Sequence, residues 1–157
     1  VLVEAQALVS ARVGNQPRRT AQGLDHGRVG LLAAVLEQRG RLPLHEHDIH
    51  TSAVGGVRVL EPAADLGVLL AVASAHLDRP LPGDMVAIGE VGLVGEVRQV
   101  NDLERRLKEA ARLGFRRAIV PASASAAVPG LEMIPVQHVL DALTATQRVR
   151  SISSNAA

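Results

Sequence analysis

The sequence contains no cysteine, tryptophan or tyrosine, and Phe115 is its only Phe, Trp or Tyr residue. Without cysteine, the chain can form neither disulfides nor thiolate metal sites. Proteins that bind single-stranded nucleic acid usually stack bases on exposed aromatic rings, and this chain has almost none to offer. Its core must therefore be packed by Val, Leu, Ile and Ala.

The sequence also lacks any apolar run near the ~20 residues that a membrane helix needs, and it has no charged-then-apolar segment typical of a signal peptide. These absences predict a soluble, cytoplasmic protein with no membrane partner. The chain begins without methionine inside an expected strand, so we expect it to be a fragment of a longer protein.

The 157 residues are enough for one domain, and 47% of them are apolar. The net charge of +1 excludes a strong overall field that would attract nucleic acid. All of the cationic residues except Lys108 are arginine. A GC-rich genome explains this bias, and recognition of phosphate groups by guanidinium is the alternative explanation.

Strand and helix patterns alternate along the chain without internal repeats, which predicts the α/β class. A polar, basic loop is expected over residues 10–23. We expect a domain over residues 1–146, followed by a disordered C-terminal tail over residues 147–157. The expected strands cover residues 1–9, 48–53, 85–88, 91–100, 117–120 and 131–136. The expected helices cover residues 27–39, 62–77 and 102–113, and a last helix begins at 139.

The segment 55–66 has the pattern of a strand end, a glycine turn and a helix that begins at Pro62. It resembles the nucleophile turn of Lon-type serine proteases, in which a serine follows the proline. Ala63 stands at that position and has no side-chain oxygen. The helix that follows is apolar almost all round, so we expect it to be central and buried.

A Ser–Lys dyad requires a lysine whose pKa is lowered by burial. The only lysine, Lys108, lies on an amphipathic helix among charged neighbours, where burial is not expected. Ser74 lies roughly 16 Å further along its helix than Ala63, so it cannot replace the missing hydroxyl locally. We therefore predict no proteolysis. A cryptic hydrolase that joins Lys108 to Ser74 or Ser52 in three dimensions is an alternative.

Three histidines and two carboxylates lie within residues 45–50, and an extended strand would place His45 and His47 on one face. The His-Glu-x-x-His helix signature is absent and the stretch follows Pro43, so we interpret it as a solvated turn and predict no metal site. No Gly-x-x-x-x-Gly-Lys-Ser/Thr loop is present. We therefore expect neither a bound cofactor nor ATP hydrolysis by this chain.

Contact between arginine and the phosphate backbone is the remaining way for this chain to bind nucleic acid. The alternative is a solvated surface on which arginines pair with carboxylates such as Glu104 and Glu109. The candidate DNA-binding residues are Arg18, Arg19, Arg105, Arg106, Arg112, Arg116 and Arg117.

An ordered set of motifs extends over about residues 1–145. It includes Pro17-Arg18-Arg19, Gly23-Leu24-Asp25, Leu31-Leu32-Ala33-Ala34-Val35-Leu36-Glu37, Val54-Gly55-Gly56-Val57-Arg58-Val59, Glu61-Pro62-Ala63-Ala64-Asp65-Leu66, Gly89-Glu90-Val91-Gly92-Leu93-Val94-Gly95-Glu96-Val97-Arg98, Arg106-Leu107-Lys108-Glu109-Ala110-Ala111 and Gly114-Phe115-Arg116-Arg117-Ala118-Ile119-Val120-Pro121. This set resembles the C-terminal Lon-protease-like domain of the RadA (Sms) family of bacterial DNA repair proteins.

The resemblance implies a ribosomal protein S5 domain 2-like fold within a homo-oligomer, a hexameric ring. RadA proteins act on single-stranded or branched DNA with the recombination machinery, and the full-length protein is implied to be a DNA-dependent ATPase or helicase. An N-terminal zinc finger and a RecA-like ATPase core lie outside this chain. ATP, Mg and zinc are therefore implied for that missing part.

In active Lon proteases the catalytic serine matches Ala63 and the catalytic lysine matches Glu104, so the resemblance implies that both positions of the dyad are changed. The function expected from the resemblance is a non-proteolytic scaffold that supports ring assembly and positions DNA for ATP-dependent branch migration. A pure oligomerisation domain without DNA contact is the other alternative.

Overall fold

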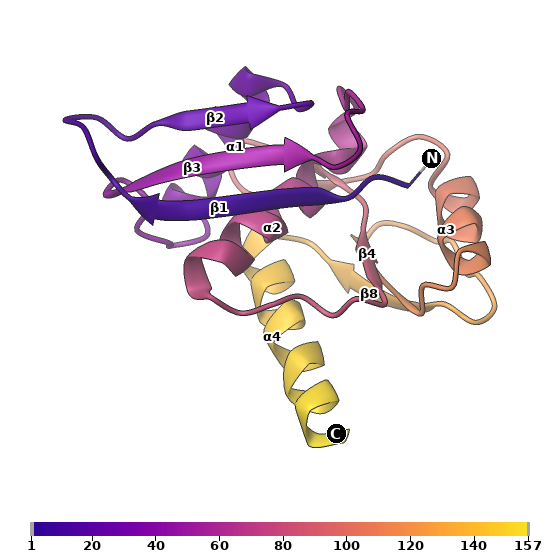
Figure 1. Cartoon of the computed structure of the whole chain (residues 1–157). Helices are drawn as coiled ribbons and strands as arrows, with labels where there is room; N and C mark the ends of the chain where they lie inside the picture. The colour runs from indigo at the N-terminus through magenta and orange to yellow at the C-terminus, as the bar shows by residue number, and fades with distance from the viewer. Residues whose placement is uncertain (1, 157) are drawn as a thin grey trace.

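The central helix α2 (Asp65–Leu77) contacts elements of two three-stranded sheets in the computed structural model of the chain (Figure 1). The structure describes the backbone of residues 2–156 and the side chains of residues 2–148. Strands and helices alternate along the described residues, so the α/β class predicted from the sequence is confirmed.

The first sheet has the order β1 (Ala5–Ala11), β3 (His47–Ala53), β2 (Arg19–Gln22). Strand β1 pairs antiparallel with β3, and β2 pairs parallel with it. The expectation of a loop over residues 10–23 was therefore wrong for β2. Its four residues carry only one apolar side chain, so periodicity could not reveal it, and pairing with β3 defines it instead.

The helices α1 (His26–Gln38) and α2 were both predicted, and they supply much of the main core with Leu32, Leu36, Leu66 and Leu69. Asp25 caps α1 by accepting a hydrogen bond of 3.0 Å from the backbone N–H of Arg28. The expected start of α2 at Pro62 is a 3-10 turn, η1 (Pro62–Ala64), which leads into the helix. The prediction that α2 is central and buried is confirmed.

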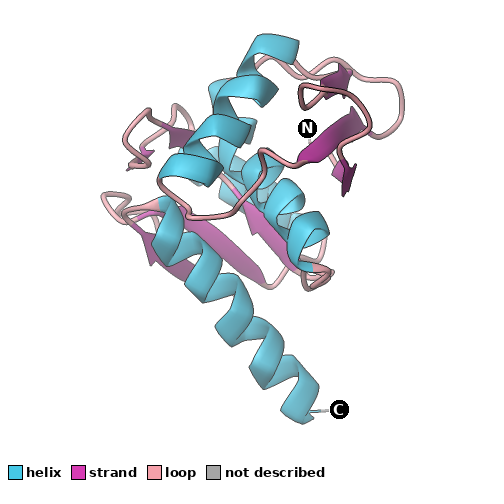
Figure 2. Ribbon diagram, turned by 90° about the vertical axis from the view of Figure 1, so that its left-hand side faces the viewer, coloured by secondary structure: helices cyan, strands magenta, loops and turns pink. Residues whose placement is uncertain are grey.

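The second sheet is wholly parallel and has the order β4 (Met85–Ala87), β7 (Arg117–Pro121), β8 (Glu132–Val136). The helix α3 (Leu103–Arg112) packs here, and its Leu107 lies in a smaller core with Ala118, Val120, Val128 and Leu131. Figure 2 shows the sheets and helices from the side.

The strand expected over residues 91–100 is instead a hairpin of β5 (Glu90–Val91) and β6 (Val97–Arg98). The backbone N–H of Gly92 donates to the carbonyl oxygen of Glu96, which closes the turn. A Cβ atom on Gly92 would overlap Glu96 Oε1, so a larger residue there would force this side chain to move. Gly92 and Gly95 therefore belong to a tight reversal and not to one continuous strand.

The last helix, α4 (Val139–Ala156), continues through the segment 147–156, for which the sequence predicted a disordered tail (Figure 2). The side chains of residues 149–156 lie outside the described part, and Ala157 is not described. The boundary between domain and tail at residue 146 stays a prediction. Within the described residues, no helix has both the length and the apolar character that a membrane span requires.

Candidate functional site

The turn that resembles a nucleophile turn is held by the backbone of the chain near β5. The carbonyl oxygen of Ala63 accepts from the N–H of Gly89 at 3.1 Å, and the N–H of Leu66 donates to the carbonyl oxygen of Gly89 at 3.1 Å. The side chain of Ala63 is a buried methyl group. The turn therefore has a defined position, yet it presents neither a hydroxyl nor a thiol.

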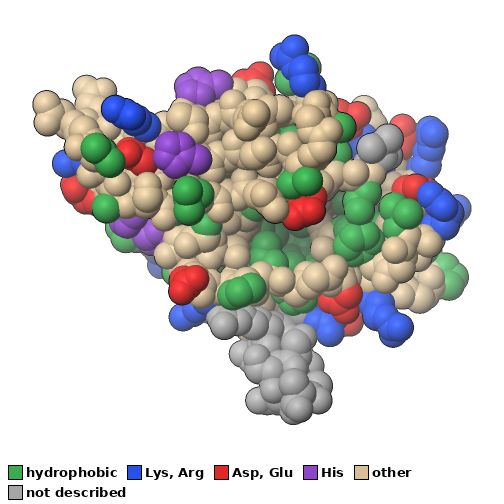
Figure 3. Space-filling model, viewed as in Figure 1, with side chains coloured by type: hydrophobic (Ala, Val, Ile, Leu, Met, Phe, Trp, Pro, Cys, Tyr) green, Lys and Arg blue, Asp and Glu red, His purple; other side chains and the backbone are tan. Residues whose placement is uncertain are grey.

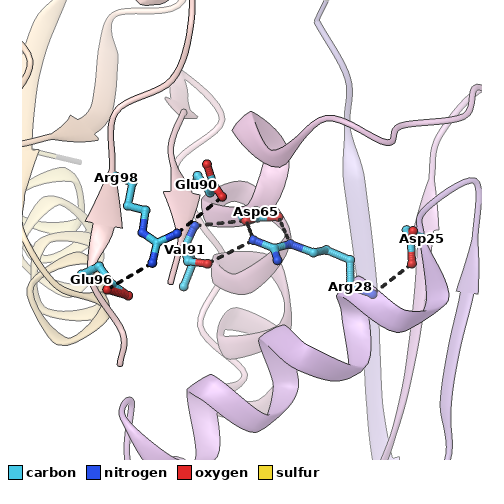
Figure 4. Close-up of polar contacts among 7 residues, drawn as sticks. All are labelled: Asp25, Arg28, Asp65, Glu90, Val91, Glu96 and Arg98. Atoms are coloured by element: carbon cyan, nitrogen blue, oxygen red, sulfur yellow. Dashed lines mark hydrogen bonds and ion pairs between the residues drawn. The ribbon is translucent and has the colours of Figure 1, made fainter. Parts of the chain in front are cut away.

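Next to this turn lies an ion pair between the buried Asp65 of α2 and Arg28 of α1, whose side chain is 34% exposed (Figure 4). Arg28 Nε donates to Asp65 Oδ1 at 2.9 Å, and Arg28 Nη2 donates both to Asp65 Oδ2 and to the carbonyl oxygen of Val91. The N–H of Val91 donates to Asp65 Oδ2 at 3.0 Å. The hydrogen bond to Asp65 raises the pKa of Arg28 above its ordinary value. The three residues thus join α1, α2 and β5 through a closed set of charge-assisted hydrogen bonds.

A hollow of about 140 Å³ opens beside this ion pair. Its walls are apolar and its polar groups are mostly carboxylates, so it has the composition of a binding pocket with an acidic rim. It is lined by Leu24, Asp25, Arg28, Val29, Leu32, Val59, Leu60, Glu61, Pro62, Ala64, Asp65, Val68 and Glu90.

Glu104, at the other expected dyad position, lies on the exposed side of α3. Its Oε1 is 2.7 Å from Lys108 Nζ, and both side chains are more than half exposed. This hydrogen bond lowers the pKa of Glu104. The lysine is therefore solvated and ion-paired, which is the opposite of the desolvation that would make it a base.

The structure does not join Lys108 to the serines that the hydrolase alternative requires. Ser74 Oγ donates to the carbonyl oxygen of Arg79 at 2.6 Å, and Ser52 Oγ to that of Ala53 at 3.5 Å. Both hydroxyls thus bond to neighbouring backbone rather than to an amine. No Ser–Lys pair of the described residues is assembled for nucleophilic attack.

Comparison with known proteins gives this geometry a family context. Residues 34–154 match the Lon protease (S16) C-terminal proteolytic domain. The chain belongs to this family. The match of the Lon dyad positions to Ala63 and Glu104 stays a prediction from the sequence.

The chain is also similar to curated proteins named DNA repair protein RadA. It is 45% identical over 150 residues to that of Mycolicibacterium smegmatis, covering 96% of this chain and 31% of the relative. It is 47% identical over 146 residues to those of Escherichia coli and Bacillus subtilis, covering 92% and 91% of this chain and 32% of each relative. The chain thus spans about a third of the length of these relatives. The predicted resemblance to RadA is confirmed, and the chain is a Lon-like domain of the RadA type.

The structure divides the seven arginines proposed for DNA contact in this Lon-like domain. Arg106 binds Glu61 at 2.6 Å, Arg112 binds Glu109 at 2.6 Å, and Arg117 lies 3.8 Å from Asp84. Charges that are paired in this way are less available to phosphate.

Arg19 is used inside the fold. Its guanidinium donates to the carbonyl oxygens of His47 at 2.6 Å and Leu44 at 3.2 Å, and burial lowers its pKa. It holds the segment before β3 against β2.

The other three candidates, Arg18, Arg105 and Arg116, are exposed, and their guanidinium groups make no hydrogen bond or ion pair with the described residues. Arg105 lies on α3 and Arg116 just before β7. Arg18 lies at the end of the β1–β2 connection, at the other end of the molecule (Figure 1). We call the end of the molecule where α3 lies the α3 end. Figure 3 shows Lys and Arg side chains there, with acidic side chains among them.

The three histidines of residues 45–50 take different partners. His45 Nδ1 is 3.0 Å from Glu37 Oε1, His50 Nδ1 is 2.7 Å from Thr20 Oγ1, and the ring of His47 lies edge-on to that of His76, with 4.9 Å between centroids. Among the residues that the structure describes, no three His, Cys, Asp or Glu side chains are placed to hold a metal ion. The segment His47–His50 belongs to β3, so its interpretation as a solvated turn was wrong there.

Sequence reasoning missed the ion pair of Arg28 and Asp65. The two signals that were present are Asp65 in the first turn of an apolar helix and the cap residue Asp25 three positions before Arg28. A carboxylate at the N-terminus of a helix is ordinary, because the helix dipole favours it. The partner 37 positions away follows only from the packing of α1 against α2.

Proposed function

We propose that the chain is a non-proteolytic, Lon-like scaffold of a RadA-type DNA repair protein. In this role it supports the assembly of a hexameric ring and positions DNA for ATP-dependent branch migration by an ATPase part outside this chain. The similarity to curated RadA proteins supports the DNA repair role, and the S16 family match supports an S5 domain 2-like fold.

One observation carries the loss of proteolysis. The buried methyl of Ala63 and the solvated carboxylate of Glu104 stand at the two positions where a Ser–Lys dyad is expected. A methyl group cannot attack a peptide bond, and a carboxylate paired with Lys108 cannot replace a desolvated amine. The architecture of the turn persists through backbone hydrogen bonds that need no catalytic side chain.

The proposed DNA contact rests on exposed arginines at the α3 end, Arg105 and Arg116. Guanidinium groups without a protein partner bind phosphate at lower cost, because no existing ion pair has to be broken. The resemblance to RadA adds the remaining parts of this proposal. The partners are single-stranded or branched DNA and recombination proteins, ATP, Mg and zinc belong to the part outside this chain, and the location is cytoplasmic. Aromatic stacking has no part in the proposal, since Phe115 is half-buried.

The DNA affinity of the full-length protein tests this proposal across a range of salt concentrations. Replacement of Arg105 and Arg116 by Gln should weaken binding and lower the slope of log K against log salt by about 1 for each phosphate that the variant no longer binds. Arg112→Gln is the matched control, since Arg112 is exposed on the same helix but bonded to Glu109.

An unchanged affinity and slope in the double variant, with rings intact, would contradict DNA contact by these residues and favour the pure oligomerisation domain. A full-length protein that never forms rings would contradict the scaffold role itself. Turnover of peptides by the purified chain, abolished by Lys108→Gln, would revive the hydrolase.

A further inference from the structure

The connection between β1 and β2 projects from one end of the first sheet (Figure 1). Val13 in this connection is 83% exposed, the most exposed of the large hydrophobic side chains that the structure describes. Arg12 precedes it, and Arg18 stands at the other end of the connection. At this exposure the side chain contributes almost no apolar burial to this domain alone, and a partner can bury it.

The base of this loop is held in a defined shape by the buried carboxylate of Asp48. Asp48 Oδ1 accepts from the N–H of Arg18 at 2.8 Å, and Oδ2 lies 3.4 Å from the N–H of Val13. The hydrogen bond from Arg18 is the main reason why the pKa of Asp48 is lowered. Arg12 also pairs with Glu46 at 3.3 Å. Val13 is therefore presented on a preformed loop, which reduces the entropy that docking would cost.

The loop precedes β2, whereas the hollow beside the ion pair of Arg28 and Asp65 lies past the C-terminal end of that strand. Leu24, which lines the hollow, follows the last residue of β2 by two positions. The hollow's volume of about 140 Å³ is sufficient for an aliphatic side chain. An engineered apolar cavity of about 150 Å³ holds a whole benzene molecule. Leu60 lies at the hollow with 63% of its surface exposed, so this apolar wall is also uncovered.

The two features are complementary in polarity and charge. The loop carries an apolar tip between Arg12 and Arg18. The hollow has apolar walls and the carboxylates of Asp25, Glu61 and Glu90. Glu61 pairs with the partly buried Arg106 at 2.6 Å, and Glu90 pairs with the exposed Arg98 at 3.8 Å. The longer and more exposed Glu90 pair is therefore the easier one to exchange.

We propose that the loop of one copy of this chain docks into the hollow of the next copy, with Val13 inside and Arg18 facing Glu90. The two surfaces lie at opposite ends of β2, so one chain cannot satisfy both of them by itself. Such a contact is heterologous, and repeating it gives a ring if the rotation closes. This inference rests on the proposed ring assembly and names the contact that builds it.

Disulfide trapping tests the contact directly, because the 157 residues of this chain contribute no cysteine that could form a competing disulfide. A variant with both Val13→Cys and Leu60→Cys should form a ladder of linked oligomers on a non-reducing gel after mild oxidation. Either single variant should form dimers at most. The control pairs Val13→Cys with Leu93→Cys, because Leu93 is 66% exposed but lies on the β5–β6 hairpin outside the hollow. The inference is overturned if the hollow pair links no more than this control.

Sedimentation of the full-length protein provides the second measurement. Val13→Asp should weaken assembly at least tenfold, since it places a carboxylate against an acidic rim, and the far-ultraviolet spectrum should stay unchanged. Leu113→Asp, an exposed residue at the α3 end, is the matched control. Rings that form normally with Val13→Asp would overturn this contact and leave the scaffold proposal standing. A natural protein that forms no rings would overturn both.

Discussion

The starts of α2 and α3 lie at or next to Ala63 and Glu104, the two residues that the sequence analysis matched to a Lon dyad, and they are built differently. At α2, Asp65 is 2% exposed and is bonded to Arg28 and to the backbone of Val91. At α3, the cap residue Asp102 has a left-handed backbone with φ of 57° and makes no side-chain cap, and Glu104 is solvated. The start of α2 therefore lies in the interior of the fold, and the start of α3 lies on its surface.

This difference shows what preserves a turn that has no catalytic serine. A buried carboxylate is tolerated only where its hydrogen bonds are satisfied, so the network around Asp65 determines how α1, α2 and β5 meet. The start of α3 has no such requirement and depends on the apolar contacts of Leu107 and Ala110. Substitutions at the two starts should therefore differ widely in effect.

The largest effect is expected from Asp65→Ala. This change removes three charge-assisted hydrogen bonds and leaves the N–H of Val91 without an acceptor. Because a bond to a charged group contributes about 1.5–3 kcal/mol, we expect the free energy of unfolding to fall by about 3–5 kcal/mol. Denaturant unfolding measures it, with Glu104→Ala as the control that should unfold almost as the natural chain does. Equal unfolding free energies for Asp65→Ala and Glu104→Ala would contradict the difference between the starts of α2 and α3.

A similar but smaller contrast is expected for apolar side chains. Leu69→Ala in the buried part of α2 should cost about 2–5 kcal/mol, because it leaves a cavity in the main core. Leu113→Ala at the exposed end of α3 should stay within about 0.5 kcal/mol. The midpoint of urea unfolding compares the two variants. A large loss of unfolding free energy in Leu113→Ala would show that this exposed side chain stabilises the fold, which would contradict the prediction.

The end of α2 should respond to pH. Burial, and then the charge of His47, lower the pKa of His76, so the folded state favours its neutral form. The unfolded chain takes up the proton near the ordinary pKa of about 6.5. Stability should therefore be full above that pH and decline as the pH falls through the folded pKa.

Melting temperatures measured between pH 8 and 5 show this decline, and His76→Gln should flatten the curve over this interval. The same slope in both proteins would assign the pH dependence to other groups.

The smallest effect is expected from removal of the surface pair on α3. Glu104→Gln or Lys108→Gln separates two solvated charges, so the melting temperature should stay within the error of the measurement. High salt should change the natural protein and the variants alike. A clear loss of stability in either variant would mean that the second dyad position keeps a structural role.

Local patterns were sufficient for the helices and for most strands. The spacing of Val29, Leu32 and Leu36 predicted α1, and Pro62 followed by an apolar run predicted a buried α2. The resemblance to RadA also depended on short motifs that can be read without a structure. These features are encoded by residues close together in the chain.

The positions of charged side chains could not be predicted in this way. Arg19 donates to backbone carbonyls and Arg28 to a buried carboxylate, although nothing in the local sequence of either residue indicates such a partner. The short strand β2 and the hairpin around Gly92 were missed for the same reason, since both depend on pairing with another segment.

The sequence alone thus determined the class, the family resemblance and the absence of a hydroxyl at Ala63, because these depend on residue identity and spacing. Only the tertiary structure decided what surrounds that position: a turn tied to Gly89, the pair of Arg28 and Asp65, and a hollow with an acidic rim. The physical reason is that a charge must find its partner across the fold, and this partner is selected by packing rather than by neighbours in the chain.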